Sequence, residues 1–158
     1  MTHPNVERVV AAATAAGLQI EVRQFPEGTR TALEAASAIG VGVGQIVKSL
    51  VFGVDDEIVM ALVSGANTLD ESLLAVAAGG QRCVRVDADA VRAATGFPIG
   101  GVPPFGLATQ LRIFVDPDLL KFDEVWAAAG TWHDVFAIDP RVLQSVTNGV
   151  VVEPRRTP

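Results

Sequence analysis

The sequence predicts an α/β fold in a single domain, with a mixed and mostly antiparallel sheet of about seven strands, barrel-like and flanked by helices. Three observations predict it. The length of 158 residues corresponds to one domain. A hydrophobic content of 49% and a mean hydropathy of +0.37 exclude a disordered chain. Apolar runs of strand length alternate with helical patterns through short connections, which favours a mixed sheet over strict parallel winding.

The first half of the chain contains two helical patterns and a hairpin. Apolar residues recur at helical spacing from Val6 to Ala13, and apolar and polar residues alternate over 18–22 as in a half-buried strand. Thr31 followed three residues later by Glu34 is typical of a capping box. In order, the predicted elements are a helix from Val6 that stops at Gly17, a strand over 18–22, a helix capped by Thr31 that ends at Gly40, and a hairpin of strands 46–54 and 57–63.

The second half alternates helices and strands around a loop rich in glycine and proline. Residues 125–129 are predicted as a strand, although 126–129 could equally form a helix. In order, the predicted elements are a helix capped by Thr68 with Glu71 and ended by Gly79–Gly80, a strand over 83–86, a helix from Asp87 to Gly96, a strand over 111–115, a short helix from Asp118, strands over 125–129 and 135–138, a helix capped by Asp139, and a strand over 150–153. One domain therefore covers residues 1–153, and residues 154–158 are expected to fray.

Charge and composition exclude several classes of function. Twelve Lys and Arg against eighteen Asp and Glu give a net charge of −6, so a broad basic surface for nucleic acid is not expected. A start without a secretory pattern and a single cysteine suit the cytoplasm. The uncharged stretch 93–111 contains too many glycines and prolines for a membrane helix. Two histidines and one cysteine, far apart, predict no metal site.

Three motifs fail as functional signatures. The glycines between Gly40 and Gly44 lack the spacing of a dinucleotide site and follow a helix instead of a strand. Lys48 does not directly follow a glycine, as the lysine of a phosphate loop must. Cys83 lies in an apolar strand pattern, where a lone cysteine is far more often an inert core residue than a nucleophile.

Lys48 is the first candidate functional residue. Alternation within the apolar strand 45–52 places Lys48 on one face and Ser49 on the other. Lysine is almost never buried without a partner, because removing water from its ammonium group is costly. Two interpretations remain open: the ammonium reaches solvent at the sheet edge, or it points into a cleft and holds an anionic or electron-rich ligand.

The loop 96–106 is the second candidate, and it contains four glycines and three prolines. The pair Gly100 and Gly101 lets backbone N–H groups approach a ligand closely, and the prolines stiffen the chain around them. Such a loop can bind an anion or an oxyanion. The alternative is an ordinary rigid connection between a helix and a strand.

His133 is the third candidate, in a predicted loop between two strands. A loop histidine can titrate near neutral pH and act as a donor, a base or a ligand binder. A surface histidine without a function is the simpler alternative.

A resemblance to a known family runs through five segments, which are 31–41, 45–52, 65–70, 95–106 and 125–130. The most specific pair is Gln45-Ile-Val-Lys48, followed about fifty residues later by a Gly-x-x-x-Pro loop. Together and in order, these segments resemble the YbaK family of aminoacyl-tRNA editing domains, which also occurs inserted in bacterial prolyl-tRNA synthetases. The resemblance covers most of the chain, from about Val6 to Val152.

The resemblance implies a YbaK-like fold and hydrolysis of the ester between a wrong amino acid and the 3′-terminal adenosine of a tRNA. The functional lysine of the family is expected to fix the adenosine or its phosphate, and the amides of its Gly-x-x-x-Pro loop to hold the aminoacyl carbonyl. The ribose hydroxyl of the substrate is expected to help position or activate the water. Carried over to this chain, the catalytic residues are Lys48, Gly100, Gly101 and His133, and the substrate-binding residues are Ser49, Val102, Pro103 and Pro104.

We therefore expect a free-standing trans-editing deacylase without a cofactor or a metal. Synthetases discriminate poorly between amino acids that differ by about one methylene, so the expected substrate is alanine, serine or cysteine mischarged on a tRNA, with tRNA(Pro) the natural candidate. An aminoacyl-tRNA synthetase or an elongation factor is the expected protein partner, because an acidic chain binds RNA weakly. The alternative function is a non-catalytic module that binds an adenosine-like ligand or a protein partner in the same pocket.

Overall fold

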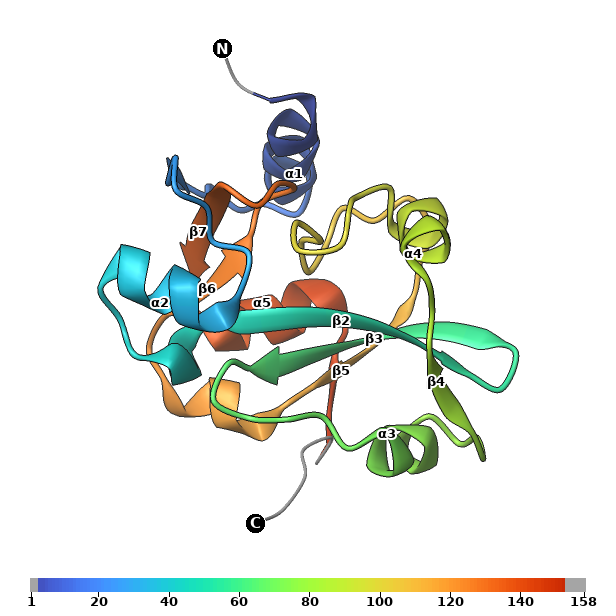
Figure 1. Ribbon diagram of the computed structural model, residues 1–158. Coiled ribbons are helices and arrows are strands. Elements are labelled where there is room, and N and C mark those ends of the chain that lie inside the picture. The colour runs from blue at the N-terminus through green and yellow to red at the C-terminus, as the bar shows by residue number, and fades with distance from the viewer. Residues whose placement is uncertain (1–2, 153–158) are drawn as a thin grey trace.

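The computed structural model describes residues 3–152, and its elements follow the predicted order (Figure 1). The helices of this part of the chain are α1 (Pro4–Ala15), α2 (Ala32–Ile39), α3 (Glu71–Ala77), α4 (Ala88–Thr95) and α5 (Pro140–Thr147), with the 3₁₀ helices η1 (Val43–Gln45) and η2 (Pro117–Lys121). Its strands are β1 (Val22–Gln24), β2 (Val47–Val54), β3 (Glu57–Ser64), β4 (Cys83–Arg85), β5 (Arg112–Val115), β6 (Val125–Ala128), β7 (Asp134–Ile138) and β8 (Val150–Val151).

The strands form two sheets instead of one. The smaller sheet has the order β1-β7-β6, and the larger has the order β4-β2-β3-β5-β8. Only the pairs β3–β5 and β5–β8 run parallel among the strands of residues 3–152, so the prediction of a mixed, mostly antiparallel fold is confirmed. The prediction of one barrel-like sheet is wrong. Within the described residues a single bridge, between Ile46 and Trp126, joins the two sheets, and the sheets do not close into a barrel.

The long hairpin of β2 and β3 positions the candidate site. Its register runs from Val47 opposite Ser64 to Val54 opposite Glu57, as the apolar runs predicted. β4 pairs with β2 only over 52–54. The first half of β2 therefore has a free edge on the side away from β3, and this edge borders the site described below.

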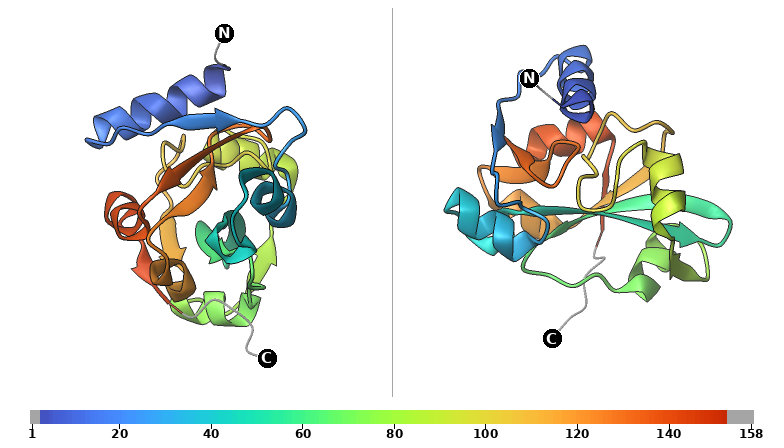
Figure 2. Two further views of the ribbon diagram at one scale, coloured as in Figure 1. Left: turned by 90° about the vertical axis from the view of Figure 1, so that its left-hand side faces the viewer. Right: turned by 45° about the horizontal axis from the view of Figure 1, so that its top comes forward.

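Two helix caps test the sequence analysis. The Thr31 hydroxyl accepts a hydrogen bond from the Glu34 N–H at 3.1 Å, so the predicted cap of α2 is confirmed. The predicted cap of α3 is wrong: Asp70, not Thr68, accepts a hydrogen bond from the Leu73 N–H at 3.1 Å. Figures 1 and 2 show α1 at one end of the molecule, next to the smaller sheet, and α3 at the other end, next to β4.

Three further strand predictions can be compared with the structure. β1 begins at Val22 instead of spanning 18–22, because only residues 22–24 pair with β7. Residues 125–128 form a strand and not a helix. The last strand is limited to Val150–Val151, and both Glu153 and the predicted frayed tail 154–158 lie outside the described residues.

The largest apolar cluster is built from residues of both sheets, and Phe97, Leu119 and Phe136 are fully buried in it. None of the helices within residues 3–152 combines the length and the apolar character that crossing a membrane requires.

Candidate functional site

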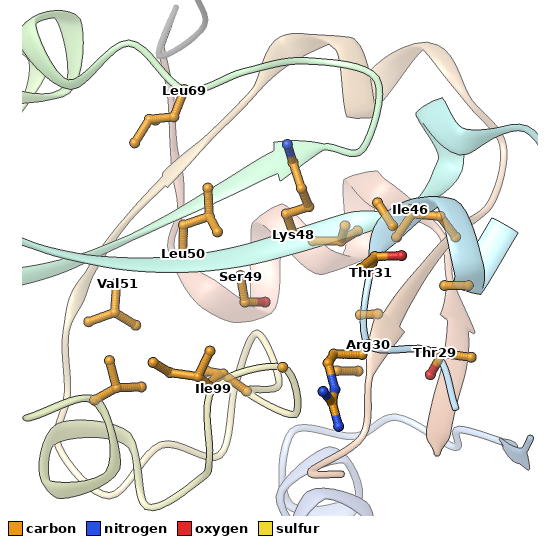
Figure 3. Close-up of a pocket in the computed structure, with 18 of the residues that line it drawn as sticks. Thr29, Arg30, Thr31, Ile46, Lys48, Ser49, Leu50, Val51, Leu69 and Ile99 are labelled. Atoms are coloured by element: carbon orange, nitrogen blue, oxygen red, sulfur yellow. The ribbon is translucent and has the colours of Figure 1, made fainter. Parts of the chain in front are cut away.

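A cavity of about 520 Å³ lies beside the free edge of β2 (Figure 3). Its walls come from the segment 29–32, β2, the segment 68–71, the loop 99–102 and β6. Three basic side chains and one acidic side chain line it, which are Arg30, Lys48, Arg85 and Glu71. In a chain with a net charge of −6, the cavity therefore concentrates positive charge.

Lys48 is half-buried in the wall of this cavity. Its ammonium group donates a hydrogen bond to the carbonyl oxygen of Asn67 at 2.5 Å. Burial lowers the pKa of Lys48 below its usual value, and the negative charge of Asp116 acts in the opposite direction. The side chain is thus neither fully solvated nor paired directly with a carboxylate, and it forms part of the cavity wall.

A buried acidic residue, Asp116, holds the residue that accepts the hydrogen bond from Lys48. Asp116 is fully buried, and its carboxylate accepts hydrogen bonds from the Ser64 N–H at 3.1 Å and from the Asn67 side-chain amide at 2.7 Å. The same amide donates to Asp118 at 2.8 Å. These bonds hold Asn67, so the carbonyl that accepts from Lys48 has a fixed position.

Ser49 follows Lys48 and points to the opposite side of β2, toward Ile99 (Figure 3). Its hydroxyl oxygen is buried, and no hydrogen-bond partner for it exists within residues 3–152. Trp126 also lines the cavity, and its indole N–H is likewise buried without a hydrogen-bond partner within residues 3–152. Leaving a buried polar atom unsatisfied is costly, and residues 3–152 supply a partner to neither atom.

The Gly/Pro loop, residues 96–106, contributes to the cavity through only part of its length. Gly100 and Val102 line the cavity. Gly101, Pro103 and Pro104 are buried and do not line it. The Gly101 N–H donates to the carbonyl oxygen of Pro98 at 3.0 Å, and prolines have no N–H to offer. In the part of the chain that the structure describes, no acceptor takes the N–H of Gly100 or of Val102.

Gly100 and Gly101 are both required by close packing on the segment 130–132. Gly100 has a φ of +89°, and a Cβ there would lie 2.8 Å from Cδ1 of Trp132. A Cβ at Gly101 would lie 2.9 Å from the carbonyl oxygen of Gly130. The loop therefore has a structural reason for its glycines in addition to any role in binding.

His133 is not among the residues that line the cavity. Its Nδ1 lies 3.2 Å from the carbonyl oxygen of Phe25, and its own carbonyl oxygen accepts from the Phe25 N–H at 2.7 Å. These contacts connect the residue before β7 to the chain just after β1.

Three charged residues of the cavity were not predicted to belong to a functional site: Arg30, Glu71 and Arg85. Arg30 directly precedes the cap of α2, and its guanidinium carbon lies 3.7 Å from the ring centre of Trp132. No local pattern marks these residues as parts of one site, because they come from separate elements that meet only in the fold. Among residues 3–152 no group of three or more His, Cys, Asp and Glu side chains could hold a metal ion.

Comparison with known proteins places this site within a family. Residues 26–146 match the family described as the aminoacyl-tRNA editing domain. Over 107 residues the chain is 38% identical to the proline–tRNA ligase of Maridesulfovibrio salexigens. This alignment covers 68% of the chain and 18% of the ligase. It is 27% identical over 130 residues to the "Putative Cys-tRNA(Pro)/Cys-tRNA(Cys) deacylase EbsC" of Enterococcus faecalis, covering 82% of this chain and 79% of that protein.

A solved structure, "Crystal structure of a putative trans-editing enzyme for prolyl tRNA synthetase", is similar over 99% of this chain and 100% of that one, with a TM-score of 0.94 and 41% identity. The family match contains every residue that lines the cavity. The resemblance to the YbaK family inferred from the sequence is thereby confirmed. The chain belongs to the aminoacyl-tRNA editing domain family, whose members are deacylases that hydrolyse mischarged aminoacyl-tRNA.

Proposed function

We propose that this chain is a free-standing deacylase that hydrolyses a small amino acid, such as alanine, serine or cysteine, from a mischarged tRNA(Pro). The 3′-terminal adenosine with its amino acid would occupy the cavity beside β2. A volume of about 520 Å³ is in the range of sites that enclose a small ligand.

The observation that carries the proposal is the distribution of charge. Arg30, Lys48 and Arg85 line the cavity with Glu71 as the only acidic side chain among its lining residues, although the whole chain has a net charge of −6. RNA affinity depends on neutralising phosphates with basic side chains. Cations gathered at one cavity favour binding of the end of an RNA strand there, without a broad basic surface.

The chemistry proposed is attack of water on the ester carbonyl carbon. The bond between that carbon and the ribose oxygen breaks, the ribose oxygen takes up a proton, and the amino acid leaves as a free acid. The N–H groups of Gly100 and Val102 are the donors that would stabilise the negative charge on the carbonyl oxygen. The Lys48 ammonium would hold the adenosine or its phosphate.

The lining residues contain no nucleophile paired with a general base. Their titratable groups are one lysine, two arginines and one carboxylate. Attack assisted by the neighbouring ribose hydroxyl of the substrate fits such a cavity, because the substrate then supplies the polar group that positions the water. Ser49 and Trp126 offer the unpaired hydroxyl and N–H that could contact the amino acid.

The names of two similar proteins support the choice of tRNA. One is named a deacylase of Cys-tRNA(Pro) and Cys-tRNA(Cys), and the other a trans-editing enzyme for prolyl-tRNA synthetase. A synthetase or an elongation factor would present the acceptor end, since the cavity offers few phosphate contacts.

A panel of tRNAs charged with alanine, serine, cysteine and proline tests the proposal. We expect release of one or more of the small amino acids from tRNA(Pro) and no release of proline. Hydrolysis of none of them above the spontaneous rate would overturn the proposal. Adenosine-dependent thermal stabilisation in that case would favour the binding module instead.

A further inference from the structure

We propose that Arg30 and Trp132 form a stacking site at the mouth of the cavity, which binds the nucleotide preceding the terminal adenosine. This inference rests on the proposed function and extends it from the reacting adenosine to the single-stranded RNA tail. The ligand class is a pyrimidine or purine nucleotide with its phosphate, bound without hydrogen-bond reading of the base.

The geometry of the pair is fixed by the Gly/Pro loop. The indole N–H of Trp132 donates to the carbonyl oxygen of Ile99 at 2.9 Å, and Gly100 packs against the indole edge, where a Cβ would lie 2.8 Å from Cδ1. Arg30 covers one face of this ring at 3.7 Å. The loop that lines the cavity therefore also orients the stacked pair, and the two sites are continuous.

The pair remains accessible. Trp132 is 39% exposed and the neighbouring Ile99 is 54% exposed, which is high for large apolar side chains. Arg30 is also exposed and lines the cavity. Figure 3 shows its guanidinium pointing away from Lys48, so the two cations lie toward different ends of the cavity. A strand whose terminal nucleotide lies near Lys48 would leave past Arg30.

The positive charge of Arg30 is not paired with a carboxylate in the described part of the chain. Within residues 3–152 it forms no ion pair, whereas Arg112 pairs with Glu57 at 2.7 Å and Arg141 with Asp139 at 3.2 Å. A planar guanidinium can stack on a base and donate to a phosphate at the same time. Aromatic and guanidinium stacking is the common way in which proteins hold single-stranded RNA without sequence preference.

The occupant is RNA and not an acidic protein because three features coincide at one place. These are an exposed aromatic ring, a stacked cation without a carboxylate partner, and direct continuity with the cavity that takes the adenosine in the proposed function. An acidic peptide would need the charge only, and it would not require the ring.

The test compares two substrates: a full mischarged tRNA, and the same amino acid esterified to adenosine alone, which has no preceding nucleotide. For Arg30→Ala and Trp132→Ala we expect KM for the tRNA to rise about 5- to 100-fold with little change in kcat. Hydrolysis of the aminoacyl-adenosine should be unchanged in Arg30→Ala. Trp132→Phe, which keeps a ring, should retain most of the affinity even if Trp132→Ala disturbs the loop.

Arg82→Ala is the matched control. Arg82 is an exposed arginine, and it does not line the cavity. Its substitution should leave both substrates unaffected. An equal loss on both substrates in Arg30→Ala, or no loss on either, would overturn the inference.

Binding separates this inference from the proposed function. If wild-type protein hydrolyses neither substrate, the deacylase proposal fails, and affinity for the trinucleotide CCA then tests the stacking site alone. Tighter binding of CCA than of adenosine, lost in Arg30→Ala, supports the site. Equal affinity of the wild type and the variant for CCA overturns it.

Discussion

The ammonium group of Lys48 donates a hydrogen bond to the backbone carbonyl oxygen of Asn67 at 2.5 Å. The Asn67 side chain is held in turn by Asp116 and Asp118, at 2.7 and 2.8 Å. Because Asp116 is fully buried and accepts hydrogen bonds from Ser64 and Asn67, this arrangement holds the lysine along the cavity wall. The position of Lys48 thus depends on residues that do not line the cavity.

Substitution of Asn67 by alanine tests that dependence. It removes two hydrogen bonds to carboxylates, and we expect the free energy of unfolding to fall by about 2 kcal/mol. We also expect slower deacylation, since the segment that accepts from Lys48 loses its anchor. Urea denaturation measures the first effect. Gln110→Ala, at an exposed position, is the control, and an Asn67→Ala protein as stable as that control would contradict the prediction.

Ser49→Ala should separate stability from function. The Ser49 hydroxyl is buried without a partner in the described residues, so its removal should leave the free energy of unfolding unchanged or raise it by up to about 1 kcal/mol. If the hydroxyl contacts substrate, kcat/KM should fall in the same variant. Thermal unfolding and deacylation are measured on one preparation. A clear loss of stability would mean that the hydroxyl has a structural partner after all.

Gly100→Ala should be costly for two reasons that a control can separate. Gly100 has a φ of +89° and a Cβ there would lie 2.8 Å from Trp132, whereas Gly17 has a φ of +80° with nothing within 4 Å. Gly17→Ala should therefore lose only the backbone cost, about 1 kcal/mol. Gly100→Ala should lose about 1–2 kcal/mol more and shift the tryptophan fluorescence. Equal losses in the two variants would show that the contact with Trp132 is unimportant.

Cys83 should be unreactive in the folded protein. Burial, with a smaller contribution from Glu71, raises the pKa of this thiol from 9.0 to about 11. Its thiolate, the species that reacts with alkylating reagents, is therefore scarce at pH 8 and forms only as the pH approaches 11. Iodoacetamide labelling at pH 8 should be far slower in the native protein than in urea. Comparable rates in the two states would contradict the raised pKa.

The raised pKa of Cys83 also makes the stability of the protein depend on pH. The unfolded thiol, with the lower pKa, releases its proton first, so between about pH 9 and 11 the folded state binds more protons than the unfolded state. The contribution of Cys83 to stability is thus complete below pH 9 and is lost as the pH rises through this window. Cys83→Ala should remove that part of the pH dependence.

Local sequence patterns predicted most elements because local physics determines them. Asp55 and Asp56 interrupt two apolar runs, and the chain reverses there, with Asp55 in the left-handed conformation at a φ of 52°. Thr31 caps α2 as its spacing to Glu34 indicates. Thr68 and Asp70 are both good caps for one helix, however, and only burial of Leu69 and Leu74 in the finished fold decides between them.

The division into two sheets could not be predicted from the sequence. Strand pairing is a choice among distant partners, and the alternation at Leu18 and Ile20 reports burial, not pairing: both pack against the core without joining β1. For the same reason Arg30, Lys48 and Arg85 could not be seen as one group, since they lie before α2, in β2 and in β4. Lys48 stands out in the sequence because it lies in the middle of the long apolar run 46–54.

The rate of amino acid release from mischarged tRNA(Pro) by Lys48→Met tests the central claim most directly. Burial already disfavours the charged lysine, so Lys48→Met should fold with a melting temperature equal to or above that of the wild type. Arg82→Met, at an exposed arginine outside the cavity, is the control. We predict a loss of about 100-fold or more in the single-turnover rate for Lys48→Met and none for the control. A folded Lys48→Met protein that deacylates at the wild-type rate would contradict the account.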